Sequence, residues 1–213
     1  MKKTSKYSAE DKKITEDLYH YFLQSNQDDG WGDKDKYGNF AKLITLTSYT
    51  KSSLEGSTVL DVGCGTGDFS EYLRERNISD YTGLDLVELS IQLAQMKYPS
   101  EKFIIGDFLT TSFPSRFDYV FCSGTLAAIL DTNNYTMMEA FITKMWKLCS
   151  KGVALNFLIQ RTPRDHDDTL FLYDVEKVLS LTKKAVPDAK ISHELHRAGD
   201  HDEFLQAHLF LYR

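Results

Sequence analysis

Apolar residues recur along the chain with two periods, and each period predicts a different kind of element. Residues 14–22 carry apolar side chains at i, i+4, i+7 and i+8, which predicts a helix that begins after the cap candidate Ser8. Residues 25–39 are rich in Gly and Asp and predict a loop around Trp31, and residues 40–47 predict a second short helix. The chain therefore opens with helices.

Further along, short apolar runs alternate with helical stretches of about ten residues. Strands are predicted at residues 58–63, 81–86, 102–108, 117–123 and 152–158, and helices at 69–77, 89–98 and 134–149. This alternation is typical of βαβ units, in which helices cover both faces of a parallel sheet. We therefore expect an α/β fold.

The last part of the chain departs from this alternation. One more helical stripe, at residues 171–182, is followed by two segments with the pattern of strands, at 189–197 and 202–213. So short a connection permits a hairpin and excludes a parallel crossover. The pattern predicts a mainly parallel seven-stranded sheet with an antiparallel C-terminal strand and an N-terminal helical extension.

Composition and charge limit the classes of binding partner that we expect for this protein. The net charge is −6 over 213 residues, so the chain lacks the basic face that nucleic-acid binding requires. No apolar run approaches the roughly 18 residues of a membrane span, and no apolar stretch follows the first lysines as in a secretory signal. Three cysteines without paired spacing indicate reduced thiols, so we expect a cytoplasmic protein that is a monomer or homodimer.

The segment VLDVGCGTG, residues 59–67, is a strand that breaks into three glycines two positions apart. A strand, a glycine turn and a helix build a binding site from backbone N–H groups. The dinucleotide pattern G-x-G-x-x-G requires a third glycine at position 68, where Asp68 stands and is expected to repel a diphosphate. A cofactor with a positive centre and a small zwitterionic tail fits better.

Four segments in order, LDVGCGTG, YTGLDL, IIGDFL and DYVFCSGTLA, resemble the motifs of class I S-adenosylmethionine-dependent methyltransferases. The resemblance implies a Rossmann-like fold and S-adenosyl-L-methionine as cofactor. It implies cofactor contacts at Asp61, Gly63, Cys64, Gly65, Gly67, Asp85, Leu86, Asp107, Phe108, Cys122 and Ser123.

Individual roles follow from the same resemblance. Asp85 would accept the ribose hydroxyls, Asp107 would take the adenine amino group, and Phe108 would lie along the adenine ring. Structural roles stay open for several of them: Asp61 as a pin for the turn, Phe108 as core and Cys64 as a small filler.

The acceptor is constrained mainly by what is missing. CSGT stands where enzymes that methylate bases and glutamine carry N/D-P-P-Y, and no acid ends the fourth strand as in magnesium-dependent enzymes, so no metal is expected. We expect O- or N-methylation of a small polar molecule, with His166 as a candidate catalytic base. Further acceptor or lid candidates are Trp31, Tyr37, Arg161 and Tyr173.

We interpret residues 1–213 as a single methyltransferase domain with three parts. Residues 1–52 are the helical cap, 53–158 the cofactor-binding half, and 159–213 the substrate-side segment with the C-terminal hairpin. Three alternatives remain at this point: a non-catalytic S-adenosylmethionine-binding regulator, a methyltransferase acting on RNA or protein, and an aminopropyl transferase of the same fold.

Overall fold

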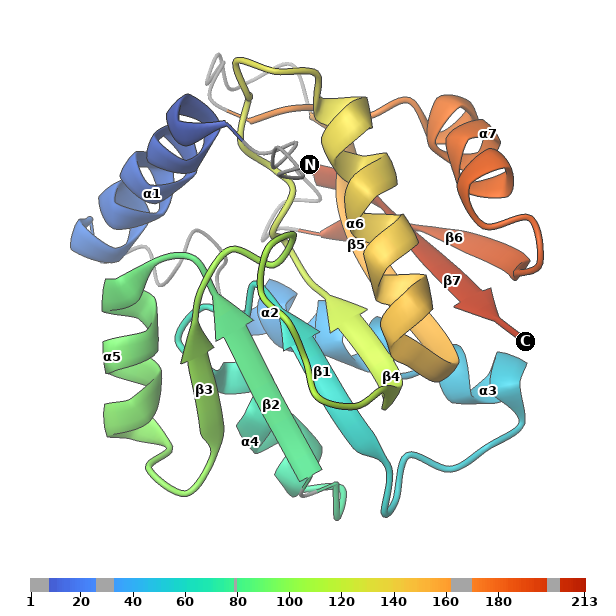
Figure 1. The fold of residues 1–213 in the computed structure, drawn as a ribbon, viewed down its shortest axis with the longest axis horizontal. Coiled ribbons are helices and arrows are strands. Elements are labelled where there is room, and N and C mark those ends of the chain that lie inside the picture. The colour runs from blue at the N-terminus through green and yellow to red at the C-terminus, as the bar shows by residue number, and fades with distance from the viewer. Residues whose placement is uncertain (1–7, 26–32, 79, 162–169, 199–203) are drawn as a thin grey trace.

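A twisted seven-stranded sheet organises the molecule (Figure 1). The computed structural model describes residues 8–25, 33–78, 80–161, 170–198 and 204–213. The strands run in the order β3-β2-β1-β4-β5-β7-β6. Their bounds are β1 Thr58–Val62, β2 Asp80–Asp85, β3 Lys102–Ile105, β4 Phe117–Cys122, β5 Cys149–Arg161, β6 Lys190–Ala198 and β7 Phe204–Tyr212.

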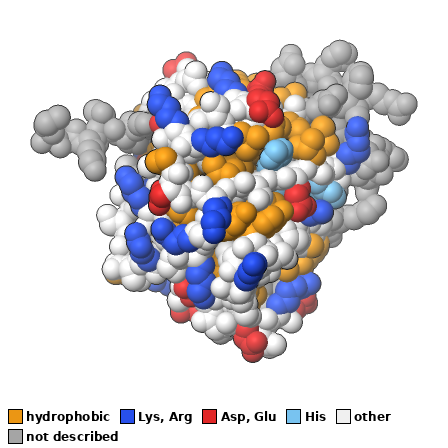
Figure 2. All heavy atoms as spheres, turned by 90° about the vertical axis from the view of Figure 1, so that its right-hand side faces the viewer, with side chains coloured by type: hydrophobic (Ala, Val, Ile, Leu, Met, Phe, Trp, Pro, Cys, Tyr) orange, Lys and Arg blue, Asp and Glu red, His pale blue; other side chains and the backbone are white. Residues whose placement is uncertain are grey.

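Strand direction confirms the predicted topology. The pairs β1–β2, β2–β3, β1–β4 and β4–β5 are parallel, whereas β7 is antiparallel to both of its neighbours, β5 and β6. The predicted C-terminal hairpin is therefore present, and its second strand lies inside the sheet. This leaves β6 as an edge strand, and the face at that edge shows Lys and Arg interspersed with apolar side chains (Figure 2).

Helices cover both faces, as the continuous burial of strands such as β1 requires. The helices are α1 Ala9–Gln24, α2 Asp33–Leu43, α3 Leu46–Thr50, α4 Asp68–Arg74, α5 Glu88–Lys97, α6 Asn134–Leu148 and α7 Val175–Ala185. Side chains of α6 and α7 pack with Leu60 and Val62 in one core, and those of α2, α3 and α4 pack with Val59 in the other. Among the described residues, no helix combines the length and apolar character needed to cross a membrane.

The first helix agrees with its prediction. Ser8 caps α1 with its hydroxyl, which accepts from Asp11 N at 3.0 Å, while the Asp11 carboxylate accepts from Ser8 N at 3.2 Å in a capping box. In Figure 1, α1 lies beyond the arrowheads of the parallel strands, above β2 and β3.

The predicted loop at residues 25–39 is wrong in its second half, because α2 already begins at Asp33. Local composition opposes a helix here, so tertiary contacts decide. The ring of Phe40 packs 4.6 Å from that of Phe69, and Lys36 forms an ion pair with Asp68. The predicted helix at 171–182 also starts late, at Val175, where Asp174 accepts from Lys177 N at 2.9 Å.

Candidate functional site

The glycine turn joins β1 to α4 at the carboxyl edge of the sheet. Gly63 and Gly67 have φ angles of 72° and 85°. Residues other than glycine rarely adopt such positive φ angles. A Cβ on Gly63 would lie 2.0 Å from Thr125 Oγ1, and one on Gly67 would lie 2.8 Å from Phe103 Cζ. The close approach to these two glycines thus comes from the protein's own side chains.

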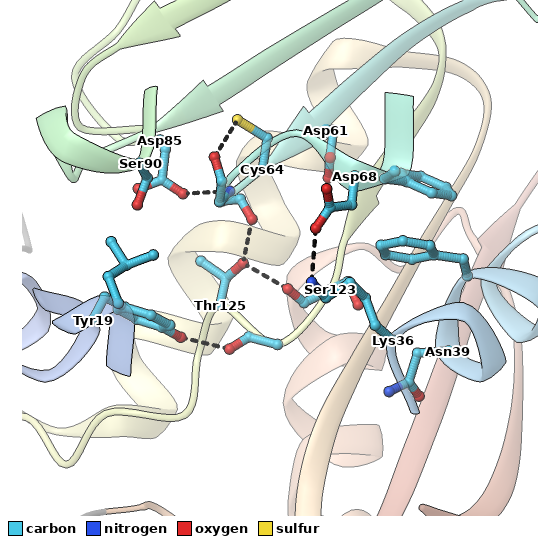
Figure 3. A pocket seen from close by; sticks show the side chains of 16 residues that line it. Tyr19, Lys36, Asn39, Asp61, Cys64, Asp68, Asp85, Ser90, Ser123 and Thr125 are labelled. Atoms are coloured by element: carbon cyan, nitrogen blue, oxygen red, sulfur yellow. Dashed lines mark hydrogen bonds and ion pairs between the residues drawn. The ribbon is translucent and has the colours of Figure 1, made fainter. Parts of the chain in front are cut away.

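A pocket opens directly beside this turn (Figure 3). Its empty volume is about 700 Å³, counting the space open to solvent. Residues from the ends of β1, β2 and β4 form one side, and residues of α1 and α2 form the other. The lining residues are Tyr19, Leu23, Lys36, Asn39, Phe40, Asp61, Gly63, Cys64, Gly65, Asp68, Phe69, Asp85, Ser90, Ser123, Gly124 and Thr125.

Two carboxylates of the pocket are held only by neutral donors. Asp61, 2% exposed, accepts a hydrogen bond from Tyr81 Oη at 2.7 Å, and burial, partly offset by that bond, raises the pKa of Asp61 to about 7. Asp85 accepts from Gly65 N at 2.9 Å and Val87 N at 2.8 Å, and burial raises the pKa of Asp85 despite these bonds. This side of the pocket is suited to a ligand with positive charge and hydrogen-bond donors.

The third carboxylate, Asp68, is compensated within the chain. Its oxygens lie 2.7 Å from Lys36 Nζ and 3.2 Å from Lys97 Nζ. Burial raises the pKa of Asp68, but the hydrogen bond and charge of Lys36 and the charge of Lys97 outweigh it and bring the pKa to about 2. The expectation that Asp68 repels a diphosphate is therefore wrong, because the two lysines offset its charge.

The predicted cofactor residues divide into two groups. Those that line the pocket are Asp61, Gly63, Cys64, Gly65, Asp85 and Ser123. Those that do not line it are Gly67, Leu86, Asp107, Phe108 and Cys122. The individual cofactor contacts of both groups stay predictions.

The predicted residues that do not line the pocket make contacts elsewhere in the protein. Gly67 is the N-cap of α4, and Leu86 packs against the core at the end of β2. Phe108 and Cys122 are buried in the core, with the Phe108 ring 5.0 Å from that of Phe141.

Asp107 follows β3 and is tied to the chain on both of its oxygens. Oδ2 lies 2.9 Å from Lys12 Nζ of α1, and Oδ1 accepts from Leu109 N at 2.8 Å. The side chain is buried. A lysine of α1 is thus paired with one oxygen of the carboxylate that the family resemblance assigns to the adenine amino group.

Of the acceptor candidates, Tyr37 and Tyr173 have described side chains, and neither lines the pocket. Tyr37 lies on α2 with its ring against Phe40 and Tyr72, outside the pocket lining. Tyr173 is buried and donates to Leu126 O at 3.0 Å, which is a structural contact beside a smaller cavity. Arg161 is the last residue of β5. Trp31 and His166 lie outside the described residues.

Sequence reasoning missed the pocket residues of the N-terminal helices and the loop after β4. Tyr19 Oη donates to Gly124 O at 2.6 Å, and Thr125 Oγ1 donates to Val62 O at 3.0 Å. The position of Thr125 directly after a strand end could have predicted it. No sequence signal marked Lys36 and Asn39, because their segment has the composition of a loop.

No group of three or more His, Cys, Asp or Glu in the described ranges is arranged to hold a metal ion.

Comparison with known proteins finds similarity to methyltransferases. Residues 59–152 match a family model described as a methyltransferase domain. The ubiquinone biosynthesis O-methyltransferase of Pseudomonas entomophila (strain L48) is 28% identical over 145 residues, which are 65% of this chain and 59% of that protein. The chain thus spans about three-fifths of the length of this curated relative.

Solved structures share the fold. Magnesium protoporphyrin IX methyltransferase from Synechocystis PCC 6803, crystallised with bound SAH, has a TM-score of 0.71 at 18% identity and covers 95% of this chain and 99% of its own. The [4+2]-cyclase SpnF has a TM-score of 0.61 at 15% identity, covering 82% of this chain and 80% of its own. Residues 59–152 thus have the sequence pattern of a methyltransferase domain, and the chain shares its fold with S-adenosylmethionine-dependent methyltransferases.

Proposed function

We propose that the protein binds S-adenosylmethionine in the pocket and transfers the methyl group to an oxygen or nitrogen of a small-molecule acceptor. The observation that carries this proposal is the pair Asp61 and Asp85, which both line the pocket beside the glycine turn. Asp61 is buried and Asp85 is half-buried, and neither carboxylate has a lysine or arginine partner among the described residues. Cationic groups and hydroxyl donors are the natural ligands of such carboxylates.

The carboxylate of Asp85 has room for such a ligand. Each of its oxygens accepts one backbone N–H, and an ionised carboxylate offers about four acceptor sites. We therefore assign the ribose hydroxyls to the remaining sites. Asp61 lies next to the first glycine and would stabilise the positive end of the cofactor.

Bound S-adenosylmethionine supplies a methyl group on a positively charged sulfur. An oxygen or nitrogen acceptor would take this methyl group by in-line displacement, with the carbon–sulfur electron pair left on sulfur and the acceptor's proton released to solvent. The protein's part is orientation and exclusion of water, and orientation alone can supply about 7–11 kcal/mol. Tyr19, Leu23 and Phe40 form an aromatic and aliphatic wall suited to that task.

We also propose that residues 1–52 act as a cap over this site. Three contacts of α1 support this role. Asp11 accepts from Thr132 N at 3.0 Å, Lys12 pairs with Asp107, and Tyr19 donates to Gly124 O. These contacts fix α1 to the loops that follow β3 and β4. The cofactor-binding half at 53–158 and the substrate-side segment at 159–213 complete the proposed division.

The curated relatives are named as O-methyltransferases of ubiquinone biosynthesis, which favours oxygen as the accepting atom. Since the same fold also serves a [4+2]-cyclase, the fold alone does not fix the reaction.

Two measurements test the proposal. Calorimetry should detect binding of S-adenosylmethionine and S-adenosylhomocysteine, and absence of binding by both would contradict it. Incubation with a metabolite extract and methyl-labelled cofactor should then label a small molecule. Binding without any transfer would favour a regulatory or cyclase-like role, and label found only in RNA or protein would favour a macromolecular acceptor.

A further inference from the structure

Four uncharged polar side chains are buried beside the pocket, where α2 packs against β5 and β7. They are Asn39, Asn156, Gln206 and His208, and none is more than 2% exposed. Burying such groups costs free energy unless they are hydrogen-bonded. The core of a sheet would be more stable with apolar residues at these positions, so their presence next to the pocket calls for an explanation.

Hydrogen bonds link the four side chains to the pocket at two points. Asn156 donates from Nδ2 to Gln206 Oε1 at 2.7 Å and accepts from Gly124 N at 2.9 Å. His208 Nε2 lies 3.1 Å from Asn39 Oδ1. Gly124 and Asn39 both line the pocket. The buried polar group therefore supports two parts of the pocket wall.

The bond between His208 and Asn39 determines which way the Asn39 amide faces. Burial, with His196 and Lys42 adding to the effect, lowers the pKa of His208 to about 3, so the ring is neutral at pH 7. Because Asn39 Oδ1 can only accept, we assign the ring hydrogen to Nε2. The amide oxygen is thereby used, and the Nδ2 group with its two donors is left.

The Nδ2 group is available to a ligand. No hydrogen bond from Asn39 Nδ2 to another described residue occurs, and this atom is not among the buried polar atoms without a partner. Asn39 lines the pocket, so its remaining donors face that space (Figure 3). Of the His208 ring nitrogens, Nδ1 has no partner within the described part of the chain, so the Asn39 bond alone sets the ring's hydrogen position.

The surroundings of Asn39 indicate the chemistry of that ligand. Tyr19, Leu23 and Phe40 contribute aromatic and aliphatic groups to the lining of the same pocket. Lys36, the cation of the described lining, is paired with Asp68. A small and largely apolar molecule with one oxygen fits this lining better than a free anion does.

We propose that Asn39 Nδ2 donates a hydrogen bond to a hydroxyl or carbonyl oxygen of the methyl acceptor, and that His208 is a positioning residue that holds the amide in place. This inference rests on the proposed function, since it requires that the cofactor occupy the rest of the pocket. A carboxylate of the cofactor's methionine part offers the same oxygen chemistry, and the test separates the two sources.

Phenol and toluene serve as matched probes, because a hydroxyl group in phenol takes the place of the methyl group of toluene and the rest of the molecule is the same. With the protein saturated by S-adenosylhomocysteine, we expect phenol to bind about fivefold more tightly than toluene. This ratio corresponds to the net free energy of one neutral hydrogen bond. Asn39→Ala should abolish this preference and leave toluene binding unchanged. His208→Leu should do the same, whereas His208→Gln, which keeps an N–H donor, should retain most of it. His193→Ala, an exposed histidine on β6, is the matched control.

Each contrary result has a distinct meaning. If the wild type binds S-adenosylhomocysteine but shows no preference for phenol, or if Asn39→Ala keeps the preference, the inference is wrong while the proposed function stands. If Asn39→Ala weakens S-adenosylhomocysteine but not 5′-methylthioadenosine, which lacks the amino-acid part, Asn39 binds the cofactor carboxylate instead. If the wild type binds no S-adenosylhomocysteine, the proposed function itself fails.

Discussion

The two sides of the pocket hold their acidic residues in opposite ways. On the β1–β2 side, Asp61 and the half-buried Asp85 are hydrogen-bonded by neutral donors, and burial raises both pKa values. On the side facing the N-terminal helices, Asp68 is paired with Lys36 and Lys97, and outside the pocket lining Asp107 is paired with Lys12 in the same way. The first two carboxylates are therefore available to a charged ligand, whereas the other two already form ion pairs within the fold.

This contrast gives a physical basis for ranking substitutions. A compensated acid should matter first for stability, because its removal takes a charged partner away from the lysine it is paired with. An uncompensated acid should matter first for ligand binding, because the folded protein gains little from its charge.

The largest effect is expected from Asp68→Ala. It leaves Lys36, 6% exposed, without its carboxylate, so the free energy of unfolding should fall by about 3–5 kcal/mol in urea denaturation. The control is Glu75→Ala, which removes an exposed pair with Arg76 and should change stability by less than about 1 kcal/mol. Equal losses in the two variants would remove the distinction between compensated and exposed pairs.

Asp85→Ala should instead reduce cofactor affinity. Loss of a charged acceptor for the ribose should weaken S-adenosylhomocysteine binding by roughly ten- to a hundredfold in calorimetry. Asp80 lies exposed at the opposite end of the same strand, so Asp80→Ala should leave the affinity unchanged. Undiminished binding by Asp85→Ala would contradict the assignment of Asp85 to the cofactor.

Asp61 predicts a pH dependence of binding. Its raised pKa of about 7 means that the carboxyl is largely protonated below pH 7 in the free protein. A cationic ligand favours the ionised form, so S-adenosylmethionine affinity should rise with pH up to about 7 and level off above it, changing by up to about tenfold per pH unit below. Asp61→Asn should flatten the profile, and an equally steep profile in that variant would assign the titration to another group.

The smallest effect concerns Lys12, whose side chain is 32% exposed in its pair with Asp107. If Asp107 takes the adenine amino group, Lys12 competes for Oδ2. Lys12→Met should then strengthen S-adenosylhomocysteine binding by about two- to fivefold, the range of a partly exposed ion pair. The matched variant Lys13→Met, one residue along the same helix, should have no effect. Weaker binding of S-adenosylhomocysteine by Lys12→Met would mean that the pair between Lys12 and Asp107 instead helps to hold α1 in place beside the pocket.

Periodicity predicted the strands and most helices because burial on both sheet faces imposes it on the sequence. It failed at α2, where Gly and Asp favour a loop but Phe40 and Lys36 find partners on α4. The same limit applies to the pocket. Motifs at strand ends predicted Asp61 and Asp85, whereas Asn39 and His208 are 169 positions apart and meet only through tertiary packing.

The interior position of β7 has a consequence for synthesis of the protein. Until residues 204–212 are made, a nascent chain has an open β5 edge with unpaired backbone groups, and β6 has no neighbour to join. Such an edge invites pairing with other chains. Because His208 belongs to this strand, the pocket wall at Asn39 also forms only at that late stage, so a ribosome-bound intermediate has the glycine turn before it has a complete site.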